Sequence, residues 1–344
     1  MNRYEFSKIL NETLIPGDVS NAQLNQAMRL IRQALLELKP NKLYRYRSVT
    51  PNNIDALKSD SVYTVTADRF NDPYDSLIQY DIDSIEKIIK ATANADFMAV
   101  LRDLIKSNSL HSDIPNFFPN GEFDQAFNNL LKTDLTNKNE INQQLTSMAN
   151  NIIAFIRVIM PVAVQQIRNS VTYACFSEKV DSITMWSHYA DYHKGFALGY
   201  NNQNLSFDAL NKVSCGLFPV TYDTVRYDAN SFVAWAIYNV FGINMKQPDR
   251  LANFKIGLQK STDWSYENEW RLICTVPLQE RTKPDATPIT ICPNEIYYGV
   301  RISNEDKMLL HEIALEKKLL EYEMLIDNAS NDYRMIIKPA TSQQ

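Results

Sequence analysis

Apolar residues recur three and four positions apart in the first forty residues, which is the spacing of helices that bury one face. The pair Pro16-Gly17 interrupts this pattern, and Pro40 ends it. Ser20 or Asn21 is placed to cap the second segment. Residues 1–40 are therefore predicted to form a pair of helices that extends the fold at its N-terminus.

From residue 41 onward, short runs of alternating character appear, as in strands with two different faces. Such runs lie at 43–47, 62–65, 171–177, 194–200, 220–222, 267–276, 288–292, 296–300 and 333–337. Short helices are predicted between them, at 52–57, 181–190, 231–241, 250–260 and 305–321. Because strands and helices do not alternate regularly, we expect an α+β fold with a central antiparallel or mixed sheet flanked by helices.

Residues 83–169 have a different character. Isoleucine, leucine and methionine occur there at helical spacing, and the middle part is rich in Asn, Phe and Gln. We interpret this segment as a helical insertion between two parts of one sheet. The predicted organisation is a helical extension at 1–40, an α+β core domain formed by 41–82 and 170–340, and the insertion at 83–169.

Composition and charge narrow the classes of function. The chain of 344 residues carries a net charge of −5 and only 8 glycines, and it contains no glycine-rich phosphate-binding motif. The net negative charge disfavours a protein that coats nucleic acid non-specifically. Four cysteines lie far apart without a C-x-x-C pair, which is typical of reduced core residues. No run is apolar and long enough to span a membrane, so we expect a cytoplasmic protein without membrane contact.

The segment that carries the most chemistry is 264–275. Its residues Glu267, Glu269 and Arg271 are two apart and would share one face of a strand. Two carboxylates and a guanidinium are costly to bury unless they neutralise one another or a ligand. Two interpretations stay open: a structural ion pair on a half-exposed strand, or a catalytic Glu-x-Glu pair.

Five motifs follow one another along the chain. They are LYRYR at 43–47, FNDPYD at 70–75, CFS at 175–177, MWSHYA at 185–190 with Lys194-Gly195, and YENEWRL at 266–272. This series resembles a bacterial domain-of-unknown-function family, the one numbered 2971. The resemblance extends from about residue 40 to residue 300. It implies a compact domain of α and β structure and no particular activity.

A second resemblance covers a shorter part of the chain and is to the ADP-ribosyltransferase fold, including its DNA-modifying toxin branch. It rests on a basic residue on a first strand, a short helix, a strand that runs into a polar loop, and a later Glu-x-Glu. The resemblance implies that Glu269 binds the ribose of NAD and stabilises positive charge as nicotinamide leaves. Glu267 would position or deprotonate the acceptor.

The same resemblance implies further contacts with NAD. Arg45 or Arg47 would bind its ribose or pyrophosphate, because a guanidinium suits anionic oxygens. Three tyrosines are candidates for stacking on nicotinamide or adenine. Asn71 could donate a hydrogen bond to the carboxamide or simply close its turn, and two further polar residues are candidates for the pocket. These six are Tyr46, Tyr63, Tyr74, Asn71, Ser177 and His188. The Ser-Thr-Ser strand motif of that fold is absent, although Thr64-Val65-Thr66 stands near its expected place.

The expected function is that of an ADP-ribosyltransferase-like enzyme that uses NAD and no metal, of the kind found in toxins and phage-defence effectors. The acceptor would be a nucleic acid, a protein or a small molecule, and an antitoxin is a candidate partner. Two other functions stay open. The chain could be a non-catalytic interaction protein whose own aromatic residues and helical insertion form a docking surface for a partner. Alternatively, Asp72, Asp75, Glu267 and Glu269 could hold Mg²⁺ in a nuclease.

Overall fold

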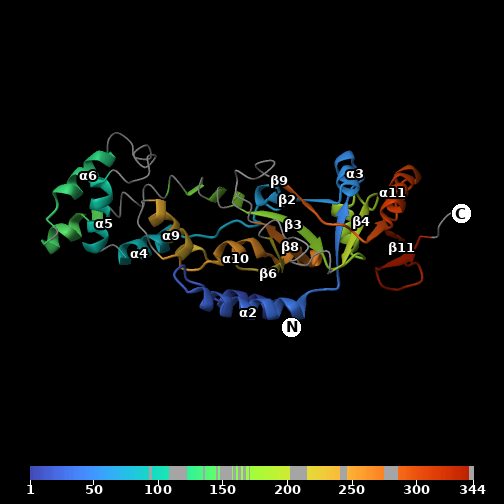
Figure 1. Ribbon diagram of the computed structural model, residues 1–344, viewed down its shortest axis with the longest axis horizontal. Coiled ribbons are helices and arrows are strands. Elements are labelled where there is room, and N and C mark those ends of the chain that lie inside the picture. The colour runs from blue at the N-terminus through green and yellow to red at the C-terminus, as the bar shows by residue number, and fades with distance from the viewer. Residues whose placement is uncertain are drawn as a thin grey trace.

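The computed structural model describes residues 1–340 except for 93–94, 108–121, 202–214, 241–245, 275–285 and scattered positions between 135 and 170. The described residues have the α+β class that the sequence predicts, with a ten-stranded mixed sheet, helices around it and an N-terminal helical pair. In Figure 1 the sheet lies toward one end of the long axis, and helices α4, α5 and α6 lie at the other.

Helices α1 (Arg3–Glu12) and α2 (Asn21–Leu38) form the predicted pair. Each begins with a capping box, in which the side chain of Asn2 or Ser20 accepts a hydrogen bond from the first turn. Their apolar faces join a core cluster that also contains Tyr173 of the sheet. The spacing of apolar residues therefore predicted both the helices and the face that they bury.

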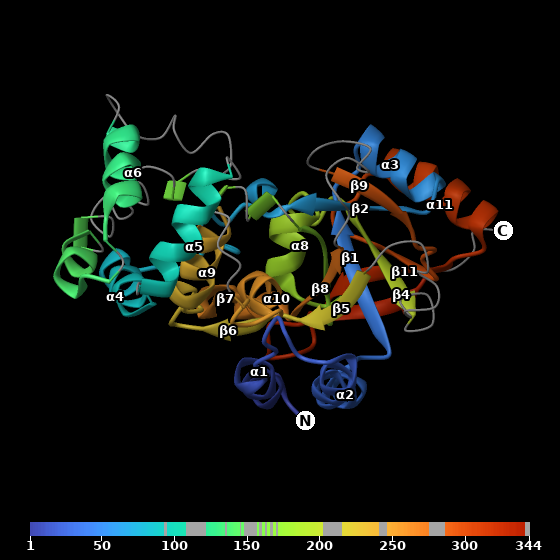
Figure 2. The same cartoon turned by 60° about the vertical axis from the view of Figure 1, so that its left-hand side comes forward.

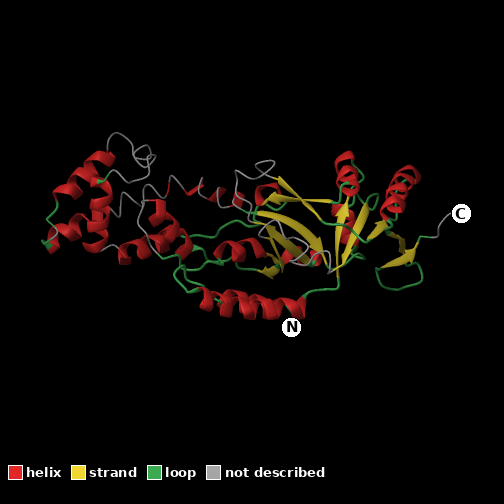
Figure 3. Cartoon of the chain, viewed as in Figure 1, coloured by secondary structure: helices red, strands yellow, loops and turns green. Residues whose placement is uncertain are grey.

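The main sheet runs in the order β12-β11-β10-β4-β1-β3-β2-β9, and β3 also pairs with β8, which carries β5. Figure 3 shows strands in yellow and helices in red. Its neighbouring strands are antiparallel except for β10 and β11. A separate parallel pair is formed by β6 and β7. The strands are β1 (Lys42–Arg47), β2 (Ser61–Thr66), β3 (Thr172–Ser177), β4 (Phe196–Asn201), β5 (Cys215–Pro219), β6 (Thr221–Asp223), β7 (Gln259–Ser261), β8 (Glu269–Cys274), β9 (Ala286–Thr290), β10 (Glu295–Tyr298), β11 (Leu320–Ile326) and β12 (Met335–Pro339).

Helices cover the sheet and extend away from it (Figure 2). The α-helices are α3 (Pro51–Lys58), α4 (Ile82–Thr92), α5 (Ala95–Lys106), α6 (Glu122–Lys132), α8 (Ile183–Tyr189), α9 (Asn230–Val240), α10 (Ala252–Leu258) and α11 (Asn304–Lys317). Two 3₁₀ turns, η1 (Ala67–Arg69) and η4 (Thr262–Glu267), lie beside the site described below. Helices α4, α5 and α6 fall within the predicted insertion, and the division of the chain into three segments stays a prediction.

The largest core cluster lies between the sheet and helices α3 and α11. It joins Leu57 of α3 and Leu310 of α11 to Phe176, Leu198 and Trp270 of three strands. All five side chains are buried, and each large apolar side chain stabilises the fold by about 2 kcal/mol through its removal from water. This packing fixes strands β3, β4 and β8, which carry or support the site.

Two predicted elements differ in the structure. The helix predicted at 305–321 ends at Lys317, because Lys318 takes a left-handed conformation with φ of 57° and strand β11 follows. The alternation from Leu320 to Ile326 is typical of a strand and identifies β11. Glu267 lies in η4 rather than in a strand, because Asn268 takes a φ of 44° and β8 begins at Glu269.

The expectation of four reduced cysteines is wrong for Cys274, which is disulfide-bonded, whereas Cys175 and Cys292 are free. Among the described residues, no helix combines the length and apolar content that crossing a membrane requires. The two free thiols differ in environment: Cys175 lies inside the sheet, whereas Cys292 is exposed.

Candidate functional site

Strand β3 gives the candidate site its shape. One of its edges pairs with β8 along all six residues, 172–177. The other edge is shared, because β1 pairs with it at Ser177 and β2 pairs with it at Thr172 and Tyr173. A cavity of about 570 Å³, lined by residues of all three strands, lies at this opening of the sheet. Its volume is within the range of small-molecule binding sites.

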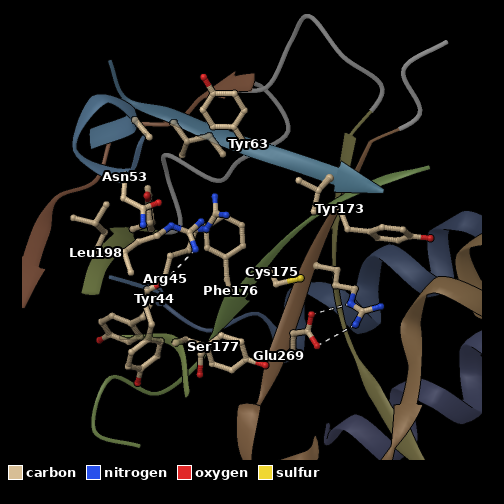
Figure 4. A pocket seen from close by; sticks show the side chains of 18 of the residues that line it. Tyr44, Arg45, Asn53, Tyr63, Tyr173, Cys175, Phe176, Ser177, Leu198 and Glu269 are labelled. Atoms are coloured by element: carbon tan, nitrogen blue, oxygen red, sulfur yellow. Dashed lines mark hydrogen bonds and ion pairs between the residues drawn. The ribbon is translucent and has the colours of Figure 1, made fainter. Parts of the chain in front are cut away.

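Charged side chains reach this cavity from both faces of β3. The register places Cys175 opposite Arg271, so these two side chains share a face with Glu269. Phe176 lies on the other face, and the Arg45 guanidinium lies 5.3 Å from the centre of its ring. Figure 4 shows Arg45, Cys175 and Glu269 together around the cavity. The predicted arginines and glutamates thus line one cavity, but they enter it from opposite faces of the sheet.

The arginine end of the cavity carries positive charge that the protein does not neutralise. The Arg45 side chain is 8% exposed, and its Nε has no hydrogen-bond partner. Within the described part of the chain, neither Arg45 nor Arg47 forms an ion pair, and Arg47 donates only to the carbonyl oxygen of Tyr46, at 3.1 Å. Burial, together with the neighbouring charge of Arg47, lowers the pKa of Arg45 to about 9. A buried cation without a partner is costly, so this end suits an anionic ligand.

Gly195 sets the position of Arg47. A side chain at this residue would place its Cβ 2.1 Å from the Arg47 carbonyl oxygen, which is closer than any real contact. The Gly195 amide also donates to the Ala190 carbonyl at 2.8 Å and so closes the turn after α8. The Lys194-Gly195 motif therefore holds the end of β1 against the turn that follows α8.

A buried ionic cluster forms the other end of the cavity. Lys260 Nζ lies 2.6 Å from Glu267, 3.3 Å from Glu269 and 3.6 Å from Asp75. Arg271 donates to both carboxylate oxygens of Asp75, at 2.8 and 2.5 Å, and its Nε donates to Glu269 at 2.8 Å. Each of these five side chains is at most 4% exposed. Three carboxylates meet two cations, so the fully ionised cluster has one excess negative charge.

The excess charge falls on Glu267. Burial raises the pKa of Glu267, and the neighbouring charge of Glu269 raises it further. Burial alone would also raise the pKa of Glu269, but Arg271 and Lys260 outweigh it and hold that pKa below its ordinary value. Glu269 is therefore a fixed anion, whereas Glu267 is the carboxylate of the pair that takes up a proton more readily.

Three sequence motifs meet at Glu267. The Tyr189 hydroxyl donates to its Oε1 at 2.5 Å, and Asn71 donates to that hydroxyl at 3.2 Å. Ser177 Oγ donates to the Glu267 carbonyl at 2.7 Å. Burial, together with Glu267, raises the pKa of Tyr189, which keeps its hydroxyl protonated. The motifs at 70–75, 175–177 and 185–190 therefore position one carboxylate at the wall of the cavity.

Most of the predicted site residues line this cavity, and two do not. Those that line it are Arg45, Arg47, Tyr46, Tyr63, Asn71, Ser177, Glu267 and Glu269. Tyr74 is 65% exposed and lines a second cavity. His188 approaches the Tyr266 hydroxyl at 3.0 Å through Nδ1 and is not part of the wall. Tyr74 and His188 are therefore left out of the NAD site that we propose.

Sequence reasoning missed Lys260 and Cys175. The sequence predicts Lys260 as the last residue of a helix at 250–260. The one signal of a site residue there is a charged side chain directly after an apolar segment. Cys175 lies between the arginine pair and the ionic cluster, and burial raises the pKa of its thiol well above the ordinary value. This thiol is therefore a neutral wall residue and a poor nucleophile.

The N-terminal helix supports this site from outside. Arg3 of α1 donates to the carbonyl oxygens of Val220 and Glu269, at 2.7 and 2.6 Å. It also forms an ion pair with Glu178 at 2.7 Å. The helical extension thus fixes the start of β8, where Glu269 lies.

The nuclease hypothesis requires Asp72, Asp75, Glu267 and Glu269 around one metal ion. Three of these carboxylates do converge, but they converge on two buried cations. Within the part of the chain that the structure describes, no group of three or more metal-ligating side chains could hold a metal ion. The geometry therefore gives the nuclease hypothesis no support.

Comparison with known proteins finds one family match, which includes a part of the site. No curated protein matches the chain, and no solved structure matches it. The resemblance to ADP-ribosyltransferases finds no support in these comparisons. A family described as Protein of unknown function (DUF2971) matches residues 185–272, which include α8, Lys260 and both glutamates, whereas the motifs at 43–47, 70–75 and 175–177 lie outside the match. Residues 185–272 thus match the family of the first resemblance noted in the sequence, over a shorter part of the chain than the expected 40–300.

Proposed function

We propose that this protein cleaves the bond between nicotinamide and ribose in NAD and transfers ADP-ribose to an acceptor. The observation that carries the proposal is one cavity with an unneutralised buried arginine at one end and a buried glutamate of raised pKa at the other. The buried charge of Arg45 favours an anionic ligand, and Glu267 can act as a base. A ligand that satisfies both must be elongated, with an anionic part and a reactive part, as a dinucleotide is.

The roles of the residues follow from their surroundings. Arg45 and Arg47 bind the pyrophosphate, for which a fixed guanidinium pair is suited. Glu269, whose charge Arg271 and Lys260 maintain, stabilises positive charge on the ribose as nicotinamide leaves. Glu267 accepts the proton that the attacking acceptor loses. Tyr63, which is 45% exposed on β2, offers a ring for stacking at the cavity mouth.

The test compares NAD cleavage by wild type and by Glu267→Gln, followed as nicotinamide release. This change keeps the shape of the side chain and removes its ability to accept a proton. Loss of a general base lowers the rate by about 100-fold or more. Glu316→Gln, at an exposed site on α11, is the matched control and should keep the wild-type rate. Equal rates for wild type and Glu267→Gln, or no NAD cleavage by wild type, would reject the proposal.

A further inference from the structure

Strand β12 lies at one end of the ten-stranded sheet, and among the described strands only β11 pairs with it. Figure 1 shows β11 and the C-terminus at one end of the long axis. The Asp327 amide donates to the Arg334 carbonyl at 3.3 Å, and the Ala340 amide donates to the Glu321 carbonyl at 2.9 Å. These bonds define which residues of β12 face β11, because hydrogen-bonded residues alternate along an antiparallel strand.

The even-numbered residues of 334–340 bond to β11, so the backbone groups of the odd-numbered residues point away from the sheet. We call residues 333–337 the outer edge of β12. This outer edge is apolar and exposed: Tyr333 is 98% exposed, and Ile336 and Ile337 are 42% and 43% exposed. An exposed apolar edge favours pairing with another strand unless charge, proline or a covering segment protects it.

A second copy of β12 is one strand that such an edge can bind. Two copies related by a two-fold axis pair in antiparallel fashion, with each residue opposite one of the second copy. In a register centred on Ile336, Arg334 lies opposite Lys338 of the second copy, and like charges directly opposite are destabilising. In a register centred on Ile337, the outward-facing Pro339 enters the pairing and has no N–H to donate. The sequence of the strand therefore disfavours these two registers.

A register centred on Met335 avoids both problems. The outward N–H groups of Tyr333, Met335 and Ile337 each meet a carbonyl of the second copy, and the Tyr333 ring lies opposite Ile337. Asp332 lies opposite Lys338 of the second copy, so opposite charges meet at both ends of the paired strands. Both of these charged side chains are exposed, and within the described chain neither has an ion-pair partner.

We propose that the protein forms a two-fold symmetric dimer through the outer edge of β12, with Met335 of each copy opposite that of the other. The two sheets then continue as one across the axis. Apolar side chains, backbone groups and charges of the outer edge are all complementary to themselves in this single register. The dimer goes beyond the proposed function and does not depend on it, because the residues that line the first cavity lie between 44 and 293.

Sedimentation velocity of the full chain over a range of concentrations tests the dimer. Wild type should show a dimer that grows with concentration. Ile337→Pro removes an outward N–H and leaves the bonds between β12 and β11 in place, so the melting temperature should change little. We expect its dissociation constant for the dimer to rise at least about tenfold, because the change removes two backbone bonds from a symmetric interface. Lys138→Asp, at an exposed site in 83–169, is the control for a change of surface charge and should dimerise as wild type does.

Charge exchange tests the register. Asp332→Lys and Lys338→Asp each place like charges opposite one another at both ends of the interface, so each variant alone should dimerise at least about tenfold more weakly than wild type. An equimolar mixture of the two variants pairs opposite charges again and should regain dimer.

The outcomes decide the proposal. Concentration-dependent dimer that is weakened by Ile337→Pro and regained in the mixture supports it. Wild type that stays monomeric at about 100 μM, a dimer unaffected by Ile337→Pro, or a mixture that associates no better than either variant alone overturns it. Growth of wild type beyond the dimer into larger assemblies also overturns it, because a two-fold interface through one edge closes at two copies.

Discussion

Replacing Arg271 by methionine tests whether the ionic cluster is held together as described. The Arg271 side chain is fully buried, and it donates to both oxygens of Asp75, to Glu269 Oε1 and to the Gly257 carbonyl at 2.7 Å. Methionine has a similar length and no charge, so Arg271→Met removes these bonds without leaving a large hole. Lys260 would then be the one cation for three buried carboxylates.

The expected loss of stability is large. Removing one partner of a buried ion pair typically lowers the free energy of unfolding by about 3–5 kcal/mol, because the other charge stays buried. The unsatisfied Gly257 carbonyl adds about 1–3 kcal/mol. Urea unfolding followed by tryptophan fluorescence would measure the difference. Arg334→Met is the control, because Arg334 is 62% exposed and water screens its ion pair with Asp327.

The loss should also depend on pH. Glu269 loses the cation that contributes most to its lowered pKa, so its pKa rises in the variant. Carboxylates with raised pKa values lower stability as pH rises through those values, so the difference from wild type should be smaller at pH 5 than at pH 8. A loss below about 1 kcal/mol at pH 8, similar to that of Arg334→Met, would refute the reasoning.

Three further substitutions follow from the same contacts. Glu267→Gln removes the excess negative charge of the cluster. Because the raised pKa of Glu267 makes its ionisation unfavourable to the folded state, the stability of the variant relative to wild type should increase as pH rises from 4.5 to 8. Urea unfolding at several pH values measures this difference. Tyr189→Phe removes a hydrogen bond that lowers the pKa of Glu267, so the acidic limb of the NAD-cleavage pH profile should move to higher pH, and an unchanged limb would contradict it. Gly195→Ala forces the Arg47 carbonyl away and should both lower the melting temperature and weaken NAD binding; wild-type values for both would show that the turn adapts freely.

Local patterns predicted the strands of the site well. The residue patterns at 43–47 and 171–177 located β1 and β3 to within one residue. The spacing of Glu267, Glu269 and Arg271 correctly suggested that these charges meet. Their detailed arrangement was not predicted, because Asn268 adopts a left-handed conformation that ends η4 and takes Glu267 off the strand.

The cavities depend on features that no local pattern carries. The opening in the sheet exists because β1 and β2 share one edge of β3, and strand pairing of this kind is set by contacts distant in sequence. Lys260 reaches the glutamates because β7 pairs with β6 and η4 turns the chain back toward β8. Lys260 lies in β7 and Glu267 in η4, so no single periodic element contains both residues and periodicity could not connect them.

The most direct test of the account is titration calorimetry of NAD into wild type and into Arg45→Met, with Arg29→Met, at an exposed site on α2, as the matched control. We predict that wild type and Arg29→Met bind NAD equally and that Arg45→Met binds at least about tenfold more weakly, a difference of about 1.4 kcal/mol or more. Wild type that binds no NAD, or Arg45→Met that binds it with unchanged affinity, would contradict the assignment of the cavity.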